Sequence, residues 1–172
     1  MFENNTLELD EIPQYQQVDY TYLHKDYVKI LWMNARITLF TGIVVSVAIY
    51  FSFEEVEKFY FIIGILFLLS YIALFPLIAY KKKKYAFRQH DVLYSNGLIF
   101  KATHIVPYIR LQHVVIKQGW YAKRLGLAVL QLHTAANDNV DVSIPGLTLE
   151  DAERWKSFLL NRLQELEDES EA

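Results

Sequence analysis

Two apolar runs, separated by a short acidic segment and followed by four consecutive lysines, constrain this chain more than any other feature. The runs are Ile37–Phe53 and Phe59–Tyr80, and neither contains a charged side chain. As α-helices they would be roughly 26 and 33 Å long at about 1.5 Å per residue, close to the ~30 Å hydrocarbon core of a bilayer. The sequence therefore predicts a transmembrane hairpin over residues 37–80, and two buried core helices of a soluble protein are the alternative.

The charges beside the runs predict how the hairpin is oriented. The connecting segment 54–58 contains three glutamates and one lysine, whereas basic side chains flank the opposite ends of both runs. These are Lys25, Lys29 and Arg36 before the first run, and Lys81, Lys82, Lys83, Lys84 and Arg88 after the second. Short loops rich in Lys and Arg stay in the cytoplasm. We therefore expect both termini in the cytoplasm and assign Lys81–Lys84 mainly to fixing topology, with specific headgroup recognition as their alternative role.

The segment 1–36 is expected to be cytoplasmic. Its first residues are polar and partly acidic, unlike a signal peptide, and residues 1–16 are predicted to be a loose leader. Tyr20–Asn34 is either an interfacial helix or the cytoplasmic extension of the first span. We favour the extension because no proline or glycine interrupts the chain from Leu23 to Phe53. Inside the hairpin, Gly42 and Ser46 have the small-xxx-small spacing that lets helices approach closely.

The hydrophobic period changes after the lysines. Val140–Ile144 alternates apolar and polar residues as a half-buried strand does, and Leu111–Gln118 and Leu127–Ala136 are apolar segments of strand length. Turn residues separate these segments, among them Asn-Asp-Asn at 137–139, which predicts a hairpin. We expect five or six short antiparallel strands in a small sandwich or barrel, with Pro145 and Gly146 ending the sheet.

A helix is predicted after the strands. Thr148 and Asp151 resemble a capping box in which Asp replaces the usual Glu or Gln. The apolar residues that follow recur at helical spacing and form one stripe: Ala152, Trp155, Phe158, Leu159, Leu163 and Leu166. The polar face is acidic and would be repelled by anionic lipid, so packing against the sheet is favoured over a membrane-surface helix. Residues 167–172 are predicted to be an acidic, disordered tail.

The region between the hairpin and this helix carries a series of short motifs. In chain order they are Tyr85–Phe87, Val92–Ile99, Ile105–Val114, Gln118–Gly119, Arg124–Ala128 and Leu132–Ala135. Together, after a helical hairpin, they resemble the bacterial PH-domain membrane family of the YdbS type. The resemblance covers about residues 20–166, and it departs at Val106, where isoleucine is expected directly before Pro107.

The resemblance implies both a fold and a function. The fold is a membrane α-helical hairpin (37–53 and 59–80) followed by an α+β cytoplasmic domain (81–166), a PH-like antiparallel sandwich or barrel capped by a C-terminal helix. The implied protein is a non-catalytic, multi-pass component of the bacterial cell (inner) membrane. It would act as an interaction or accessory subunit, beside a larger membrane protein with several PH-like domains or a second copy of itself. A lipid-headgroup sensor is the alternative function. The resemblance supplies no catalytic or ligand-binding residue.

A basic surface is the candidate binding site. Residues 85–147 carry six basic and three acidic side chains, whereas residues 148–172 carry three basic and eight acidic ones. Four residues are candidates for contact with anionic headgroups or an acidic partner segment: Arg110, Lys117, Lys123 and Arg124. The alternative is structural, with Arg110, Gln112 and Arg124 hydrogen-bonding loops together.

Enzyme and nucleic-acid functions are not expected. The histidines at 90, 104, 113 and 133 lack the His-x-x-x-His spacing of a helical metal site. The chain contains no cysteine, which excludes disulfides and thiolate metal ligands. No nucleophile motif or phosphate-binding glycine loop is present. The basic excess is small and no aromatic–basic signature strand accompanies it. We expect no cofactor, no metal and no nucleic acid.

Overall fold

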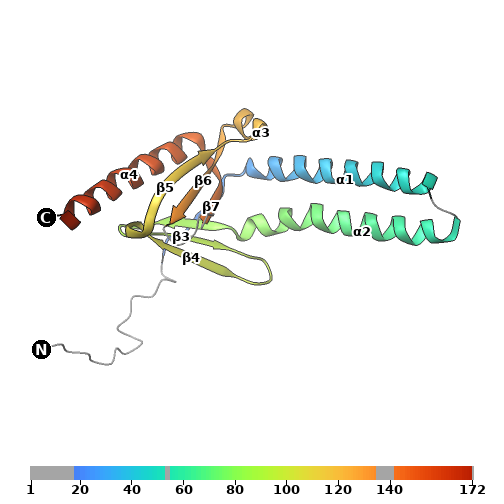
Figure 1. Ribbon diagram of the computed structural model, residues 1–172, viewed down its shortest axis with the longest axis horizontal. Helices are drawn as coiled ribbons and strands as arrows, with labels where there is room; N and C mark the ends of the chain where they lie inside the picture. Colours follow the sequence, from blue (N-terminus) through green and yellow to red (C-terminus); the bar gives the residue numbers. More distant parts are fainter. Residues whose placement is uncertain (1–17, 53–54, 135–141, 172) are drawn as a thin grey trace, which may run out of the picture.

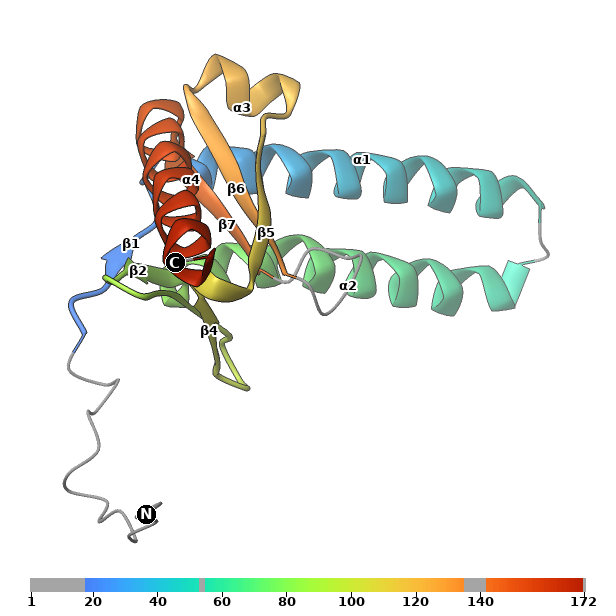
Figure 2. The ribbon, with the colours of Figure 1, turned by 60° about the vertical axis from the view of Figure 1, so that its left-hand side comes forward.

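Two long helices lie side by side and lead into a domain of two antiparallel sheets and a C-terminal helix (Figures 1 and 2). The computed structural model describes residues 18–52, 55–134 and 142–171. The predicted leader at 1–16 and the predicted hairpin turn at 137–139 lie outside the described residues.

Both apolar runs are helical. Helix α1 (Tyr27–Ser52) is continuous, so residues 27–34 extend the helix of the first run, as favoured above, and do not form a separate interfacial helix. Helix α2 (Glu55–Ala79) includes Pro76 near its end and passes into a 3-10 turn, η3 (Tyr80–Lys82). By length and composition, both helices suffice to cross a membrane.

Small residues line the contact between the two helices. Ala35, Gly42 and Ser46 of α1 and Ala73 of α2 are buried there. A Cβ atom at Gly42 would collide with the side chain of Leu69, so glycine permits the close approach. Many of the large apolar side chains of both helices point outward, Phe40, Phe51 and Phe67 among the most exposed. This arrangement is the reverse of a water-soluble helix pair, in which large apolar side chains lie inside.

Among the described residues, six strands follow the hairpin and a seventh precedes it. The first sheet contains, in order, β1 (Thr21–Tyr22), β2 (Lys84–Phe87), β3 (Asp91–Asn96) and β4 (Ala102–Pro107). The second sheet contains β5 (Leu111–Lys117), β6 (Leu127–Thr134) and β7 (Val142–Thr148) in that order. A 3-10 turn, η4 (Tyr108–Arg110), joins the sheets, and a short helix, α3 (Trp120–Arg124), joins β5 to β6. All these strand pairs are antiparallel.

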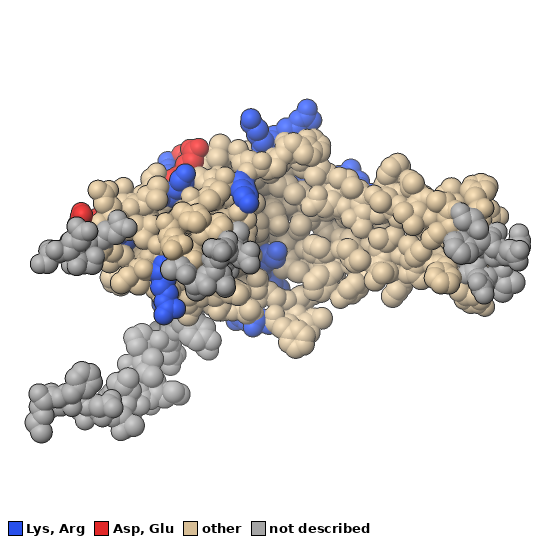
Figure 3. Space-filling view, in the orientation of Figure 1, with Lys and Arg blue, Asp and Glu red and all other residues tan. Residues whose placement is uncertain are grey.

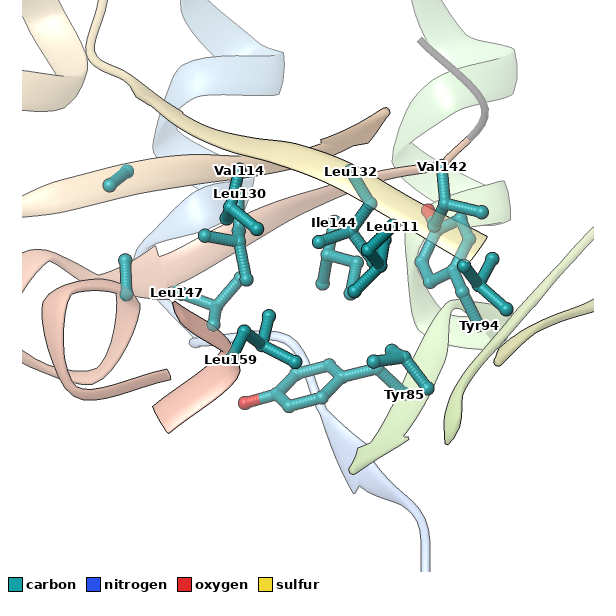
Figure 4. Packing of buried hydrophobic residues seen from close by; sticks show 14 of the residues in the cluster. Tyr85, Tyr94, Leu111, Val114, Leu130, Leu132, Val142, Ile144, Leu147 and Leu159 are labelled. Atoms are coloured by element: carbon teal, nitrogen blue, oxygen red, sulfur yellow. The ribbon is translucent and has the colours of Figure 1, made fainter. Parts of the chain in front are cut away.

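The sheets and helix α4 (Leu149–Glu171) share one apolar core (Figure 4). Leu130, Leu132, Ile144 and Leu159 are fully buried in it. The alternation predicted for β7 is present, because Val142 and Ile144 are buried while Ser143 between them is not. Burying each such side chain contributes about 1.5–3 kcal/mol of transfer free energy.

Helix α4 packs on the sheets through the predicted stripe. Ala152 and Leu159 are buried, and the ring of Trp155 stacks on Phe87 of β2 with centroids 3.9 Å apart. At the start of the helix, the Asp151 N–H donates to Thr148 Oγ1 at 3.1 Å, as in a capping box. The reciprocal bond differs: Thr148 Oγ1 donates to Asp151 Oδ2 at 2.7 Å. We attribute this to the Asp side chain, which is one methylene shorter than Glu and stays at the hydroxyl.

The predicted end of the sheet at Pro145 and Gly146 is wrong, since β7 continues to Thr148. The pairing of β6 with β7 shifts register between Ala128 and Leu130, which places Pro145 and Gly146 at a bulge. A bulged residue needs no ladder N–H, so proline is tolerated there. Gly146 adopts a φ of 69°, which glycine reaches without steric cost.

The predicted tail also begins too early, because α4 extends through residues 167–171 to Glu171. Glutamate has a good intrinsic helix propensity. That propensity lets the backbone continue its turns past the last apolar residue of the stripe, Leu166.

The hairpin is joined to the domain on both sides. Strand β1, just before α1, pairs with β2, just after α2 and η3, with Thr21 opposite Tyr85. The His24 N–H donates to the Gly146 carbonyl at 2.9 Å. A Cβ atom at Gly146 would lie only 3.0 Å from Cβ and Cγ of Tyr27. The first turn of α1 therefore rests directly on the β7 bulge.

Because α1 and α2 pack closely at Gly42, the same glycine-to-leucine substitution should affect stability differently at Gly42 and at Gly64. Gly42→Leu should destabilise the protein by about 1–3 kcal/mol, because the new side chain overlaps Leu69. Gly64→Leu on α2 is the matched control, since nothing lies within 4 Å of a Cβ at that position. Thermal unfolding in mild detergent measures both. Equal midpoints for the two variants would contradict close packing at Gly42.

Candidate functional site

An open cavity of about 640 Å³ lies between the two sheets, beside the domain ends of the helices. Its wall is formed by five strands, the first turn of α1 and the residue after η3. The lining residues are Tyr27, Lys83, Tyr94, Asn96, His104, Lys117, Val129, Gln131, Val142, Ser143 and Pro145.

The charge of this cavity favours anions. Lys83 and Lys117 contribute ammonium groups, His104 contributes an imidazole, and none of the described lining residues is acidic. Burial lowers the pKa of Lys83. An anion placed beside Lys83 would favour its charged form and offset that loss of solvation.

Uncharged polar groups complete the wall. Burial raises the pKa of Tyr94 to about 12, so its phenol stays protonated at neutral pH. Oε1 of Gln131 is buried and accepts no hydrogen bond from any described residue. A buried acceptor without a donor costs about 1–3 kcal/mol, so a bound molecule carrying a donor would recover that free energy.

The predicted basic residues do not form one patch. Arg110 precedes β5 and Lys117 ends it, which separates them by roughly 20 Å at ~3.3 Å per residue. Lys123 and Arg124 lie exposed on α3, at the Lys117 end of the strand. Figure 3 shows Lys and Arg side chains scattered over the sheets and α3, while the outer half of the described hairpin shows no charge on that face. Of the four, Lys117 alone lines the large cavity.

The residues that were predicted to hydrogen-bond loops together do not do so. Arg110, Gln112 and Arg124 are exposed, and none of their side chains hydrogen-bonds another loop in the described parts of the chain.

Gln118 and Arg88 link the loops instead. Gln118 Nε2 donates to the Leu127 carbonyl at 2.8 Å, joining both sides of α3. Arg88 forms a two-point ion pair with Asp91, with Nε donating to Oδ1 at 2.6 Å. Tyr108 Oη donates to the Arg88 carbonyl at 2.5 Å, which joins η4 to the turn between β2 and β3.

The four lysines after α2 have different surroundings. Lys81 and Lys82 are exposed on η3, Lys83 is half-buried in the cavity wall, and Lys84 lies in β2. The ammonium of Lys84 lies 3.8 Å from the ring centroid of Tyr20, a cation–π contact. Lys81 and Lys82 are therefore the two most available to solvent or headgroups.

The histidines lie in separate settings. His113 and His133 stack across β5 and β6 with centroids 4.4 Å apart, and His104 lines the cavity. Within the described residues, no group of three or more His, Asp or Glu side chains is placed to hold a metal ion.

Exposed apolar side chains are the feature that the sequence reasoning missed. Ile99 and Phe100 are 72% and 88% exposed at the tip of the β3–β4 hairpin, and Trp120 on α3 is 67% exposed. Ile109 of η4 is 77% exposed at the other end of β4. Their position in the sequence could have revealed them, because each follows or lies within a turn and does not belong to a segment with periodic hydrophobic residues.

Comparison with known proteins identifies the family. Residues 34–166 match the protein family described as bacterial PH domain, and this chain belongs to that family. The matched range includes most of α1, all of α2, strands β2 to β7 and most of α4.

A relative in Bacillus subtilis (strain 168) is described as UPF0699 transmembrane protein YdbS. It is 32% identical over 111 residues, which cover 63% of this chain and 67% of the relative. The chain is thus a YdbS-like member of a bacterial PH-domain family that includes a transmembrane protein. No solved structure matches the chain significantly.

Proposed function

We propose that this protein is a membrane-anchored interaction module of the bacterial cell membrane. The hairpin crosses the membrane twice with both termini in the cytoplasm, and residues 81–166 form a PH-like sandwich closed by α4 on the cytoplasmic face. The domain acts without catalysis, as an accessory subunit beside another membrane protein.

The joint between the hairpin and the sheets carries this proposal. β1 pairs with β2, and the His24 N–H bonds the Gly146 carbonyl, so the domain is attached through both helices rather than through a linker. A domain held this way presents its surfaces at a fixed height and orientation above a membrane. That is a useful property for a docking subunit and has no evident use in a freely moving enzyme.

The chemistry of the hairpin supports membrane crossing. Its large apolar side chains face outward, which water would oppose and lipid would favour. The hydroxyls of Thr38 and Thr41 donate to the carbonyls of Asn34 and Ile37 at 3.0 and 2.9 Å, so these polar groups are satisfied inside α1. Lys81 and Lys82 are exposed where a cytoplasmic headgroup layer would begin.

An exposed apolar surface supports partner docking. The Tyr108 ring contacts Phe158 of α4 edge-on, with centroids 6.0 Å apart. Ile109, next to Tyr108, is largely exposed, and Phe158 is 41% exposed. Aromatic and aliphatic side chains of this kind are typical anchors of protein interfaces.

Membrane topology is testable because the chain contains no cysteine. A cysteine introduced at Glu57 should react with a membrane-impermeant thiol reagent added outside intact spheroplasts. A cysteine at Glu153 on α4 should react only after the membrane is opened. The reverse pattern would contradict cytoplasmic termini, and labelling of both from outside would contradict the anchored arrangement.

Partner binding is testable with two substitutions on one helix. Full-length protein, purified in gentle detergent from its own membrane, should carry a stoichiometric membrane protein. Phe158→Asp should reduce that recovery at least about tenfold, since losing one interface anchor costs about 2 kcal/mol or more. Leu160→Asp is the matched control, because Leu160 is 44% exposed on a different side of α4. Purification of the unaltered chain alone would contradict the subunit role.

The basic cavity favours a second candidate function, recognition of anionic headgroups. Anionic short-chain phosphatidylglycerol should raise the unfolding temperature of the full-length protein in neutral detergent more than phosphatidylcholine does. Lys117→Glu should abolish the difference, because it places a carboxylate in the cavity wall. Arg110→Glu, the same change at the far end of β5, should preserve it. Identical responses of the two variants would contradict binding in the cavity.

A further inference from the structure

Trp120 is exposed on the side of the domain from which the hairpin leaves. Helix α3 contacts α1, and both ribbon views place it beside the first turns of that helix (Figures 1 and 2). Trp120 begins α3 and is 67% exposed, while its helix also carries exposed Lys123 and Arg124. A tryptophan beside basic side chains is the composition that favours a membrane–water interface.

The tip of the β3–β4 hairpin points the same way. In Figure 1 it extends past the domain end of α2 in the direction that the helices take, and Figure 2 shows that it also slants away from the helices. Gly97, with a φ of 110°, makes the turn that leads into Ile99 and Phe100. Phe100 has the largest exposed fraction among the large apolar side chains of the described residues, Ile99 is also largely exposed, and the exposed Lys101 follows them.

The contact between α1 and α2 shows which residues of the two helices lie at the same level along the helix axes, and hence where a membrane interface would lie relative to the β3–β4 tip. Gly42 lies opposite Leu69 in an antiparallel pair, so ten residues further toward the domain Trp32 is level with Ala79. Trp32 is exposed, and the apolar run of α2 ends at Tyr80. An interface at this level coincides with the end of α2, beyond which the β3–β4 tip extends.

We propose that Trp120 and the Ile99–Phe100 tip insert into the cytoplasmic interface of the same bilayer that the hairpin spans. This inference rests on the proposed membrane crossing. The bilayer is the occupant because α3 contacts α1 and the tip extends past the domain end of α2, so both features lie on the side of the domain from which the hairpin leaves. Their basic neighbours Lys101, Lys123 and Arg124 also complement an anionic leaflet, at about 1 kcal/mol per residue.

The consequence is a domain held at three places: the hairpin, α3 and the β3–β4 tip. The cavity lies between α3, the tip and the helices, since residues of β3, β4, β5 and the first turn of α1 line it. Insertion at both flanking points would turn that cavity toward the headgroup layer.

The three tryptophans provide the test, because they lie in three different places. Trp32 is on the hairpin, Trp120 on α3, and Trp155 is stacked on Phe87 in the core. Full-length variants that keep one tryptophan and replace the other two by phenylalanine are reconstituted in phosphatidylcholine–phosphatidylglycerol vesicles with and without brominated acyl chains. Brominated lipid should reduce the emission of Trp32 and Trp120 roughly twofold, as for interfacial tryptophans, and leave Trp155 nearly unchanged.

The outcomes separate this inference from the proposed function. Loss of Trp32 quenching would contradict membrane crossing itself. Quenching of Trp32 without quenching of Trp120 would overturn only the insertion of α3. Protection of Trp120 from aqueous acrylamide without quenching by brominated lipid would place a second copy of the chain on it, which also overturns the proposal.

The tip is tested in the same way with Phe100→Trp in a chain whose native tryptophans are phenylalanine. Quenching is expected, and its absence would overturn insertion of the tip. If the phenylalanine replacements impair folding, 5-fluorotryptophan labelling of chains that keep all native tryptophans gives both comparisons. Spin-labelled lipid should then broaden two of the three fluorine signals of the unmutated chain, and also the additional signal of Phe100→Trp.

Discussion

The close approach of Gly146 to the first turn of α1 determines how the two halves of this protein are joined. A side chain at Gly146 would carry the cost of a left-handed backbone, about 1–2 kcal/mol, and would press on Tyr27. The same bulge accepts the hydrogen bond from His24 and contributes Pro145 to the cavity wall. The start of the hairpin and the wall of the cavity therefore meet at this bulge.

The local sequence pattern was enough to predict the elements that are stabilised by nearby residues or by a strongly periodic apolar face. The apolar runs, the capping residues Thr148 and Asp151, and the stripe of α4 each predicted a helix that is present. Strand β1 was missed because two residues carry no period, and its partner Tyr85 lies far along the chain. The end of β7 was misplaced because proline and glycine indicate a turn in isolation, whereas here they occupy a bulge that the register of β6 creates.

The site was harder to predict than the fold, for a physical reason. Composition showed that the domain is basic, but the separation of Arg110 from Lys117 follows from strand length and direction. The cavity brings together Lys83, just after η3, and Gln131 of β6, and no sequence spacing indicates that they meet. Trp120 was available as a signal, since a large aromatic after a glycine turn has no strand to pack against.

The attachment of the domain through both helices would let a dispersed set of weak membrane contacts suffice in the proposed arrangement. A free domain must lose translational and rotational freedom when it binds a membrane, so it needs a concentrated, high-affinity site. A domain fixed to its own anchor has already lost that freedom, and each further contact acts at a high effective concentration. In the proposed arrangement, single residues such as Trp120, Phe100 and Lys123 would be enough to set its tilt. The opposite surface, around Ile109 and Phe158, would then face the cytoplasm, where the proposed partner docks.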